Sequence, residues 1–327
     1  MANGWMKHTL NPTYNFRALA LLRLIRFSNL LIVAISQYLI QYLILIPAFK
    51  KAGLTPLLDL FHFSLLVFCT LCIAAAGYII NDLLDIEIDQ INKPEKLIIG
   101  KSISIKNAWL FFFTISGIGF LIAIYLAIHV GNLWLSLIYP IAVLLLCWYS
   151  YQLKKQLFWG NLIVSIFCAF VPGVVLFAER KTFFEWHHLD DMASWNLWKL
   201  MIAYLVFAFI STLYREMIKD LEDVEGDRQK NCKTIPIQLG MERAKQVTLF
   251  VGILFLTLLI YWSINYFLAG QIGLWLYLLL GIILPLLYTL YLLFYANKKS
   301  DFSRLSRITK LIISLGLIFL VIYSFAN

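Results

Sequence analysis

The apolar positions of this chain come in long unbroken runs. No Asp, Glu, Lys or Arg interrupts the 23 residues at 27–49, the 47 at 107–153 or the 52 at 246–297. One helical membrane span needs about 20 apolar residues. Each of the two longest runs therefore predicts a pair of helices that folds back on itself.

Turn-forming residues between and within the runs divide them further. Glycine and asparagine near Gly131 and Gly270 mark two turns, because such residues commonly end helices. The whole pattern predicts an all-α, multispan membrane protein that forms one domain over residues 1–327. Its nine transmembrane helices are expected at approximately 20–48, 61–81, 106–128, 132–150, 157–178, 197–219, 245–267, 271–295 and 306–326.

The composition excludes an ordinary soluble protein. Of the 327 residues, 61% are hydrophobic and only 14% are charged, and the mean hydropathy is +0.81. Soluble domains have about 45–50% apolar and about 25% charged residues. The net charge of +9 could suggest a nucleic-acid partner. We expect none, because basic residues of membrane proteins gather in cytoplasmic loops.

The basic residues also predict the orientation of the chain. With nine spans, 22 of the 27 Lys and Arg residues fall on the side of the N-terminus and five on the other side. The positive-inside rule then places the N-terminus in the cytoplasm and the C-terminus outside. We expect the protein to reside in the plasma membrane.

The acidic residues form two clusters that match each other. Eleven of the 18 acids lie in 81–95 and 216–227. The strings NDLLDIEID at 81–89 and KDLEDVEGD at 219–227 align without a gap at an offset of 138 residues. This match indicates an internal repeat, and repeats in membrane bundles commonly place the functional site where they meet.

Together, in register, the two clusters favour a metal site over solvated charge. Asp82, Asp85 and Asp89 share one helix face, as do Asp220, Asp223 and Asp227. Like charges at this spacing repel and need a counter-charge. Carboxylate oxygens suit Mg²⁺, which typically also binds phosphate oxygens. The sequence thus predicts two facing aspartate clusters that hold a metal and a phosphate group at the cytoplasmic rim. For Glu87, Glu222 and Glu225, off the shared face, solvated charge is the preferred interpretation.

These two motifs resemble those of the UbiA family of intramembrane prenyltransferases. The first, NDxxDxxxD, stands at Asn81, Asp82, Asp85 and Asp89, and the second, DxxxD, at Asp223 and Asp227 after Lys219 and Asp220. The resemblance covers essentially the whole chain. It implies nine helices around a central cavity, Mg²⁺ as cofactor bridging a prenyl diphosphate, and a cytoplasmic cap from the loops after the second and sixth helices.

The resemblance and the residues together give the candidate site. Metal ligands are expected at Asn81, Asp82, Asp85, Asp89, Asp220, Asp223 and Asp227. The predicted catalytic residues are Asp85, Asp89, Asp223, Asp227 and Tyr149. Substrate contacts are expected from Arg26, Asn29, Lys93, Lys96, Ser150, Lys154, Tyr214 and Lys219. Aromatic faces such as those of Tyr149 and Tyr214 can stabilise an allylic cation.

The string around the second motif looks most like one branch of the family, which makes the ether lipid digeranylgeranylglyceryl phosphate. That branch implies transfer of a geranylgeranyl group from its diphosphate to geranylgeranylglyceryl phosphate. The expected partners are then a prenyl diphosphate, a lipid-soluble acceptor and membrane lipid. One alternative is an aromatic acceptor of quinone synthesis, dihydroxynaphthoate or hydroxybenzoate. Another is a cation transporter that uses the aspartate clusters.

Overall fold

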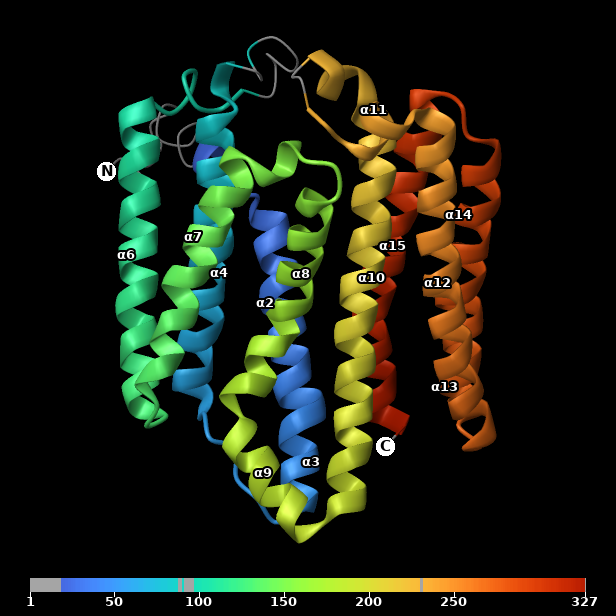
Figure 1. Ribbon diagram of the computed structural model, residues 1–327. Coiled ribbons are helices and arrows are strands. Elements are labelled where there is room, and N and C mark those ends of the chain that lie inside the picture. The colour runs from blue at the N-terminus through green and yellow to red at the C-terminus, as the bar shows by residue number, and fades with distance from the viewer. Residues whose placement is uncertain (1–18, 88–89, 91–96, 230–231, 327) are drawn as a thin grey trace, which may run out of the picture. The chain divides into compact units, whose positions relative to one another are not determined.

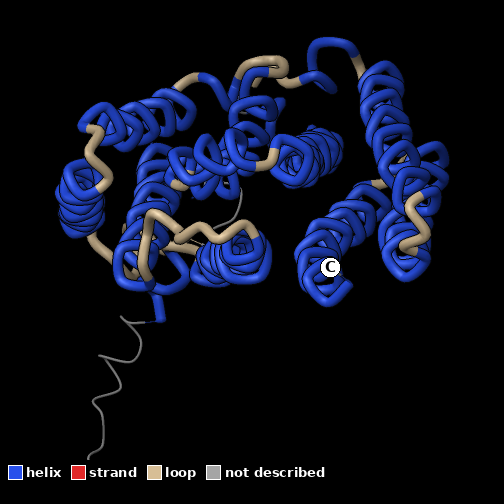
Figure 2. Tube along the Cα trace, turned by 90° about the horizontal axis from the view of Figure 1, so that it is seen from below, coloured by secondary structure: helices blue, strands red, loops and turns tan. Residues whose placement is uncertain are grey.

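The computed structural model describes residues 19–87, 90, 97–229 and 232–326, and its regular structure there is helical (Figures 1 and 2). Among these residues, nine helices are long and apolar enough to cross a membrane, as predicted. They are Phe27–Lys51, Leu60–Leu84, Ile105–His129, Leu133–Tyr151, Trp159–Ala178, Met192–Gln229, Met241–Leu268, Ile272–Tyr295 and Lys299–Ala326.

Most predicted helix ends lie within a few residues of the observed ones, with two main errors. The sixth helix is predicted to stop at residue 219, but α10 (Asp191–Gln229) continues as a helix through the second motif. The ninth is predicted from 306, whereas α15 begins at Lys299. In both cases the apolar pattern ends where charged residues begin. Glu, Lys and Arg are nonetheless good helix formers, so the helix continues beyond the apolar stretch.

One compact unit comprises residues 19–32 and Phe68–Tyr151. It contains the second half of α4 (Leu60–Leu84), α6 (Ile105–His129), the short 3₁₀ helix η2 (Leu133–Leu137) and α7 (Ile138–Tyr151).

Small residues let the helices of this unit approach closely. Gly77 of α4 faces Leu146, and Gly119 of α6 lies against the Tyr139 ring, where any side chain would overlap it. The Cys69 thiol lies 3.5 Å from the Gly119 carbonyl oxygen. Such glycine contacts are typical of membrane helices, which associate mainly through close packing.

The other compact unit comprises Val33–Val67 and residues 152–326. The first helix passes through α2 (Phe27–Leu39), a π-helical turn η1 (Ile40–Leu45) and α3 (Ile46–Lys51). Then come η3 (Leu153–Lys155), α8 (Trp159–Ala178), α9 (Arg180–Leu189), α10 and α11 (Ile235–Leu239). The chain ends with α12 (Met241–Leu268), α13 (Ile272–Tyr277), the π-helical η4 (Leu278–Ile283), α14 (Leu284–Tyr295) and α15 (Lys299–Ala326).

A buried carboxylate ties three segments of this second unit together. Glu179, at the junction of α8 and α9, is 0% exposed. It accepts hydrogen bonds from Gln41 Nε2 (2.8 Å) and from the backbone N–H groups of Leu57 (2.6 Å) and Leu58 (3.3 Å). A buried carboxylate is stable only when its oxygens are so paired. The network fixes the end of the first helix beside α9, where Phe49 also packs on Phe183.

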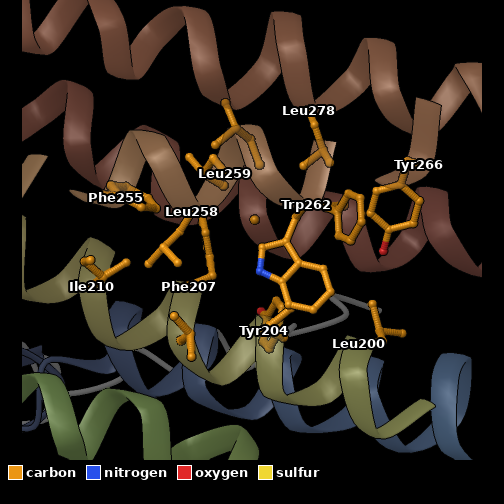
Figure 3. Close-up of a pocket in the computed structure, with 15 residues that line it drawn as sticks. Leu200, Tyr204, Phe207, Ile210, Phe255, Leu258, Leu259, Trp262, Tyr266 and Leu278 are labelled. Carbon is orange, nitrogen blue, oxygen red and sulfur yellow. The ribbon is translucent and has the colours of Figure 1, made fainter. Parts of the chain in front are cut away.

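An aromatic cavity of about 60 Å³ lies among α10, α12, η4 and α15 (Figure 3). Phe207, Phe255, Trp262 and Phe319 contribute to its wall, which is almost wholly apolar. Gly316 of α15 makes room for the Phe207 ring, since a Cβ atom at that position would overlap the ring. The close contact of α10 with α15 therefore depends on the absence of a side chain at residue 316.

We predict that Gly316→Ala lowers the free energy of unfolding by about 1–3 kcal/mol, the usual cost of overpacking a filled core. The change would force Phe207 out of its place. Gly273→Ala is the matched control, because a Cβ atom there meets nothing within 4 Å. Thermal unfolding in detergent should show a lower midpoint for the first variant only. Equal midpoints for the two variants would contradict the packing.

Candidate active site

The first motif lies at the end of α4, where the helix leaves its apolar stretch. Asn81 and Asp82 are still in the helix, and the Asp85 N–H bonds the Asn81 carbonyl (3.1 Å), which continues the turn past Leu84. The Asn81 side-chain amide donates to Asp85 Oδ2 at 3.3 Å. This amide fixes the direction of one carboxylate oxygen of Asp85.

Arg26 reaches this motif from the start of the first helix. Its Nη2 donates to Asp82 Oδ1 at 3.1 Å, and its guanidinium lies 4.6 Å from the centre of the Tyr78 ring. Tyr78 and Asp82 are one turn apart on α4, so both face the same arginine. Asn29 Nδ2 lies 3.3 Å from the Tyr78 hydroxyl oxygen. The resemblance assigned Arg26 and Asn29 to the site, and the structure brings both to the first-motif helix.

The backbone at Arg26 is strained. Its φ of 51° is the only positive value among the described non-glycine residues, and it separates helical residues 19–24 from α2. The sequence predicts one continuous helix from residue 20, so this break is a correction. A left-handed residue of this kind costs about 1 kcal/mol or more. The ion pair to Asp82 is part-exposed (44% and 23% for the two side chains) and is worth about 0–1 kcal/mol. The pair alone thus barely offsets the strain.

The second motif lies within α10. Asp220, Asp223 and Asp227 all belong to the helix, and at this spacing they share one face. Asn161, at the start of α8, donates from Nδ2 to Asp220 Oδ2 at 2.7 Å. The first aspartate of this motif is therefore held by a neutral amide, whereas that of the first motif is held by a guanidinium.

A second charged group lies one turn before these aspartates. Glu216 accepts from Lys219 Nζ at 2.7 Å and from Arg215 Nη1 at 3.0 Å. The sequence places Lys219 at the substrate but gives no role to Glu216. Since an ammonium has three donors, Lys219 can keep Glu216 and still reach a phosphate.

The connection between α7 and α8 is held beside the end of α10. The Lys233 N–H donates to the Lys155 carbonyl oxygen at 2.7 Å, and the Cys232 N–H donates to that of Asp227 at 3.0 Å. Gly160 lies against the Lys154 backbone, where a Cβ atom would be only 2.9 Å from Lys154 Cα. These contacts keep η3, with half-buried Lys154, next to the segment that follows the second motif.

The remaining predicted residues differ in their surroundings. Tyr214 is 0% exposed and its hydroxyl lies 3.2 Å from Thr289 Oγ1, so its contacts favour packing over substrate binding. Tyr149 is half-buried, and Ser150 is 1% exposed near the end of α7. Asp89, Lys93 and Lys96 lie outside the described residues, as do the other residues of 88–89 and 91–96 in the loop expected to form the cap after the second helix.

The donor set fits a hard divalent cation. The motif side chains offer carboxylate oxygens, and amides of Asn81 and Asn161 orient two of these carboxylates, as the outer contacts of metal ligands typically do. Among the described residues no three His, Cys, Asp or Glu side chains converge closely enough to enclose an ion. Mg²⁺ in proteins commonly takes one or two carboxylates and completes its shell with water and phosphate oxygens.

A family comparison matches most of the chain. The sequence model described as the UbiA prenyltransferase family matches residues 45–312. The chain belongs to the UbiA prenyltransferase family.

Two curated relatives of this UbiA protein share a name. The chain is 37% identical over 201 residues to digeranylgeranylglyceryl phosphate synthase of Sulfurisphaera tokodaii, covering 61% of this chain and 64% of that one. It is 30% identical over 254 residues to the protein of that name from Sulfolobus acidocaldarius, covering 77% and 80%. The first alignment spans less than two thirds of the relative's length.

Solved structures share the UbiA fold. One, of digeranylgeranylglyceryl phosphate synthase in membranes, matches with a TM-score of 0.67 and 22% identity, over 94% of this chain and 98% of that one. Another is a UbiA homologue of Archaeoglobus fulgidus bound to GPP and Mg²⁺, with a TM-score of 0.53 and 19% identity over 92% and 99%. These similarities establish the fold, in which the described residues form nine helices of membrane-spanning length.

We predict that Asn161→Ala weakens divalent-metal affinity about tenfold, because Asp220 loses the amide that orients it. Mn²⁺ titration followed by electron paramagnetic resonance measures the change. Asn265→Ala is the matched control, since that amide bonds the Tyr261 carbonyl on α12 instead. A metal affinity equal to that of the unchanged protein would show that the amide does not support a ligand.

Proposed function

We propose that this protein transfers a geranylgeranyl group from its diphosphate to the hydroxyl of geranylgeranylglyceryl phosphate. The C–O bond to the diphosphate breaks, an ether C–O bond forms, and diphosphate and the hydroxyl proton leave. The observation that carries the proposal is the pair of aspartate motifs at the ends of α4 and α10, in register at 138 residues within a UbiA chain. We infer from this repeat that both motifs act on one diphosphate.

The assignment of the acceptor depends on the names of the similar proteins. Both alignments reported above are to proteins named for making digeranylgeranylglyceryl phosphate, and one of them covers 77% of this chain. The fold neighbour with the TM-score of 0.67 concerns the same synthase. We infer that the chain acts as a single catalytic domain, since the family match spans 45–312.

We further propose that Mg²⁺ is the metal, as in the Archaeoglobus homologue. The residues that would hold it are the motif side chains Asn81, Asp82, Asp85, Asp89, Asp220, Asp223 and Asp227. When bound, the ion supplies electrostatic stabilisation of the departing diphosphate.

The other residues of the site stabilise charge and exclude water. Lys154 and Lys219, with Lys93 and Lys96, place positive charge where negative charge develops on the leaving group. The apolar helices around the site exclude water, so that the acceptor hydroxyl rather than water captures the allylic cation. The half-buried ring of Tyr149 is the aromatic candidate to face that cation.

The orientation follows from charge. We propose that the N-terminus and both motifs face the cytoplasm, because 22 of 27 basic residues fall on that side. The plasma membrane is the proposed location.

The acceptor can be tested with the purified full-length protein and radiolabelled geranylgeranyl diphosphate. We expect labelled lipid and released diphosphate only with geranylgeranylglyceryl phosphate, loss of both on metal chelation, and recovery with Mg²⁺. Product only with dihydroxynaphthoate or hydroxybenzoate would assign the aromatic reaction instead. Metal flux into liposomes without diphosphate release would identify a cation transporter.

Asp85→Ala or Asp223→Ala should lower turnover about 100-fold or more, because each removes a proposed metal ligand and with it stabilisation of the leaving group. Glu225→Ala is the matched control: this residue is exposed on α10, away from the shared aspartate face. It should keep normal turnover. Detergent-solubilised yield and thermal midpoint check that each variant is folded. Near-normal turnover in both aspartate variants would reject the site.

A further inference from the structure

We propose that Arg26 is an exchangeable counter-ion of the first motif: it neutralises Asp82 until metal and diphosphate arrive, then yields Asp82 to the metal and pairs with the diphosphate. The proposal rests on the proposed function and adds a coupling between the two binding events. Arg26 is thus a positioning residue for the metal ligand Asp82 as well as a substrate contact.

The contacts of Arg26 allow its guanidinium to exchange one partner while it keeps another. Its guanidinium is 3.1 Å from Asp82 Oδ1 and 4.6 Å from the Tyr78 ring centre. The aromatic contact is not directional in the way a bidentate ion pair is, so the arginine can stay over Tyr78 while its donors change partner. Asn29, bonded to the Tyr78 hydroxyl, holds that ring in position.

The backbone supports the same role. Arg26 alone among described non-glycine residues has a positive φ, at a break between two helical stretches. Its carbonyl oxygen accepts from the Asn29 N–H (2.7 Å), so the helix after the break is fixed to it. Strained residues of this kind persist where the surrounding structure requires them, commonly at functional sites. Here the left-handed backbone conformation of Arg26 places its side chain against Tyr78 and Asp82 of α4.

The second motif shows by contrast what the arginine adds. Asp82 and Asp220 correspond in the repeat, and each is held from a preceding helix. Asn161 gives Asp220 orientation without charge, so it does not compete with a cation. Arg26 gives Asp82 a full positive charge, so a metal must displace it. The ion pair is part-exposed and therefore weak enough to exchange.

The exchange predicts cooperative binding. A metal that takes Asp82 releases Arg26, and a diphosphate that takes Arg26 releases Asp82. Each ligand thus favours the other beyond their direct contact, as linkage requires. A metal that binds alone must displace Arg26 from Asp82, which weakens cation binding at the first motif when no diphosphate is present.

The test is a double-mutant cycle on Mn²⁺ affinity in the full-length protein, measured by electron paramagnetic resonance without diphosphate. Arg26→Gln should lower the Mn²⁺ dissociation constant about three- to fivefold, the equivalent of one part-exposed ion pair. Asp82→Asn should abolish this gain, so that Arg26→Gln has no effect in the double variant. Arg23→Gln is the matched control: it removes an equal exposed charge one turn away and should change affinity less than twofold.

Arg26→Gln should weaken the affinity for the diphosphate substrate, whereas it strengthens the affinity for Mn²⁺. Arg26→Gln should raise the KM for geranylgeranyl diphosphate several-fold at saturating Mg²⁺, a combination that a merely structural role does not produce. An Mn²⁺ affinity that stays unchanged in Arg26→Gln, or a gain that persists with Asp82→Asn, overturns the exchange. If the unchanged protein binds no Mn²⁺ and transfers no prenyl group, the proposed function fails instead.

Discussion

A carboxylate at the edge of an apolar helix must be reached by a positive charge or a hydrogen-bond donor, and this constraint governs how both motif helices are held. Asp82 is paired with Arg26, and Asp220 with Asn161. The buried Glu179, far from the motifs in sequence, obeys the same rule with an amide and two backbone N–H groups. In each case the partner comes from a different segment of the chain, so the polar contact also fixes the packing of two segments.

The two repeats meet this constraint in chemically different ways. A guanidinium neutralises the first motif, whereas a neutral amide orients the second, and the extra charge of the second repeat is the Arg215–Glu216–Lys219 group one turn earlier. An internal repeat can thus keep its aspartates and diverge in the groups that hold them. In the exchange that we propose, this difference lets the second motif bind a cation without displacing a charge, whereas the first motif responds to an anion.

The apolar parts of the helices are held by shape. Gly119 admits Tyr139 in one unit, and Gly316 admits Phe207 in the other. Lipid tails are as apolar as the helices, so burial of apolar surface gives little net drive for association in a bilayer. Close packing at glycines and hydrogen bonds of buried polar side chains therefore carry the specificity of helix association.

The sequence by itself determined the nine spans, the two aspartate motifs and the family, because apolar run length and aspartate spacing are local properties of the chain. It ended the sixth helix too early, since apolarity marks the bilayer and not the end of the helical hydrogen-bond ladder. Only the tertiary structure decided that Arg26 pairs with Asp82 across 56 positions, that Asn161 holds Asp220, and that Tyr214 is packed against Thr289. Such pairings depend on which side chains neighbouring helices bring within about 3 Å of each other, and that distance is set by packing rather than by spacing along the chain.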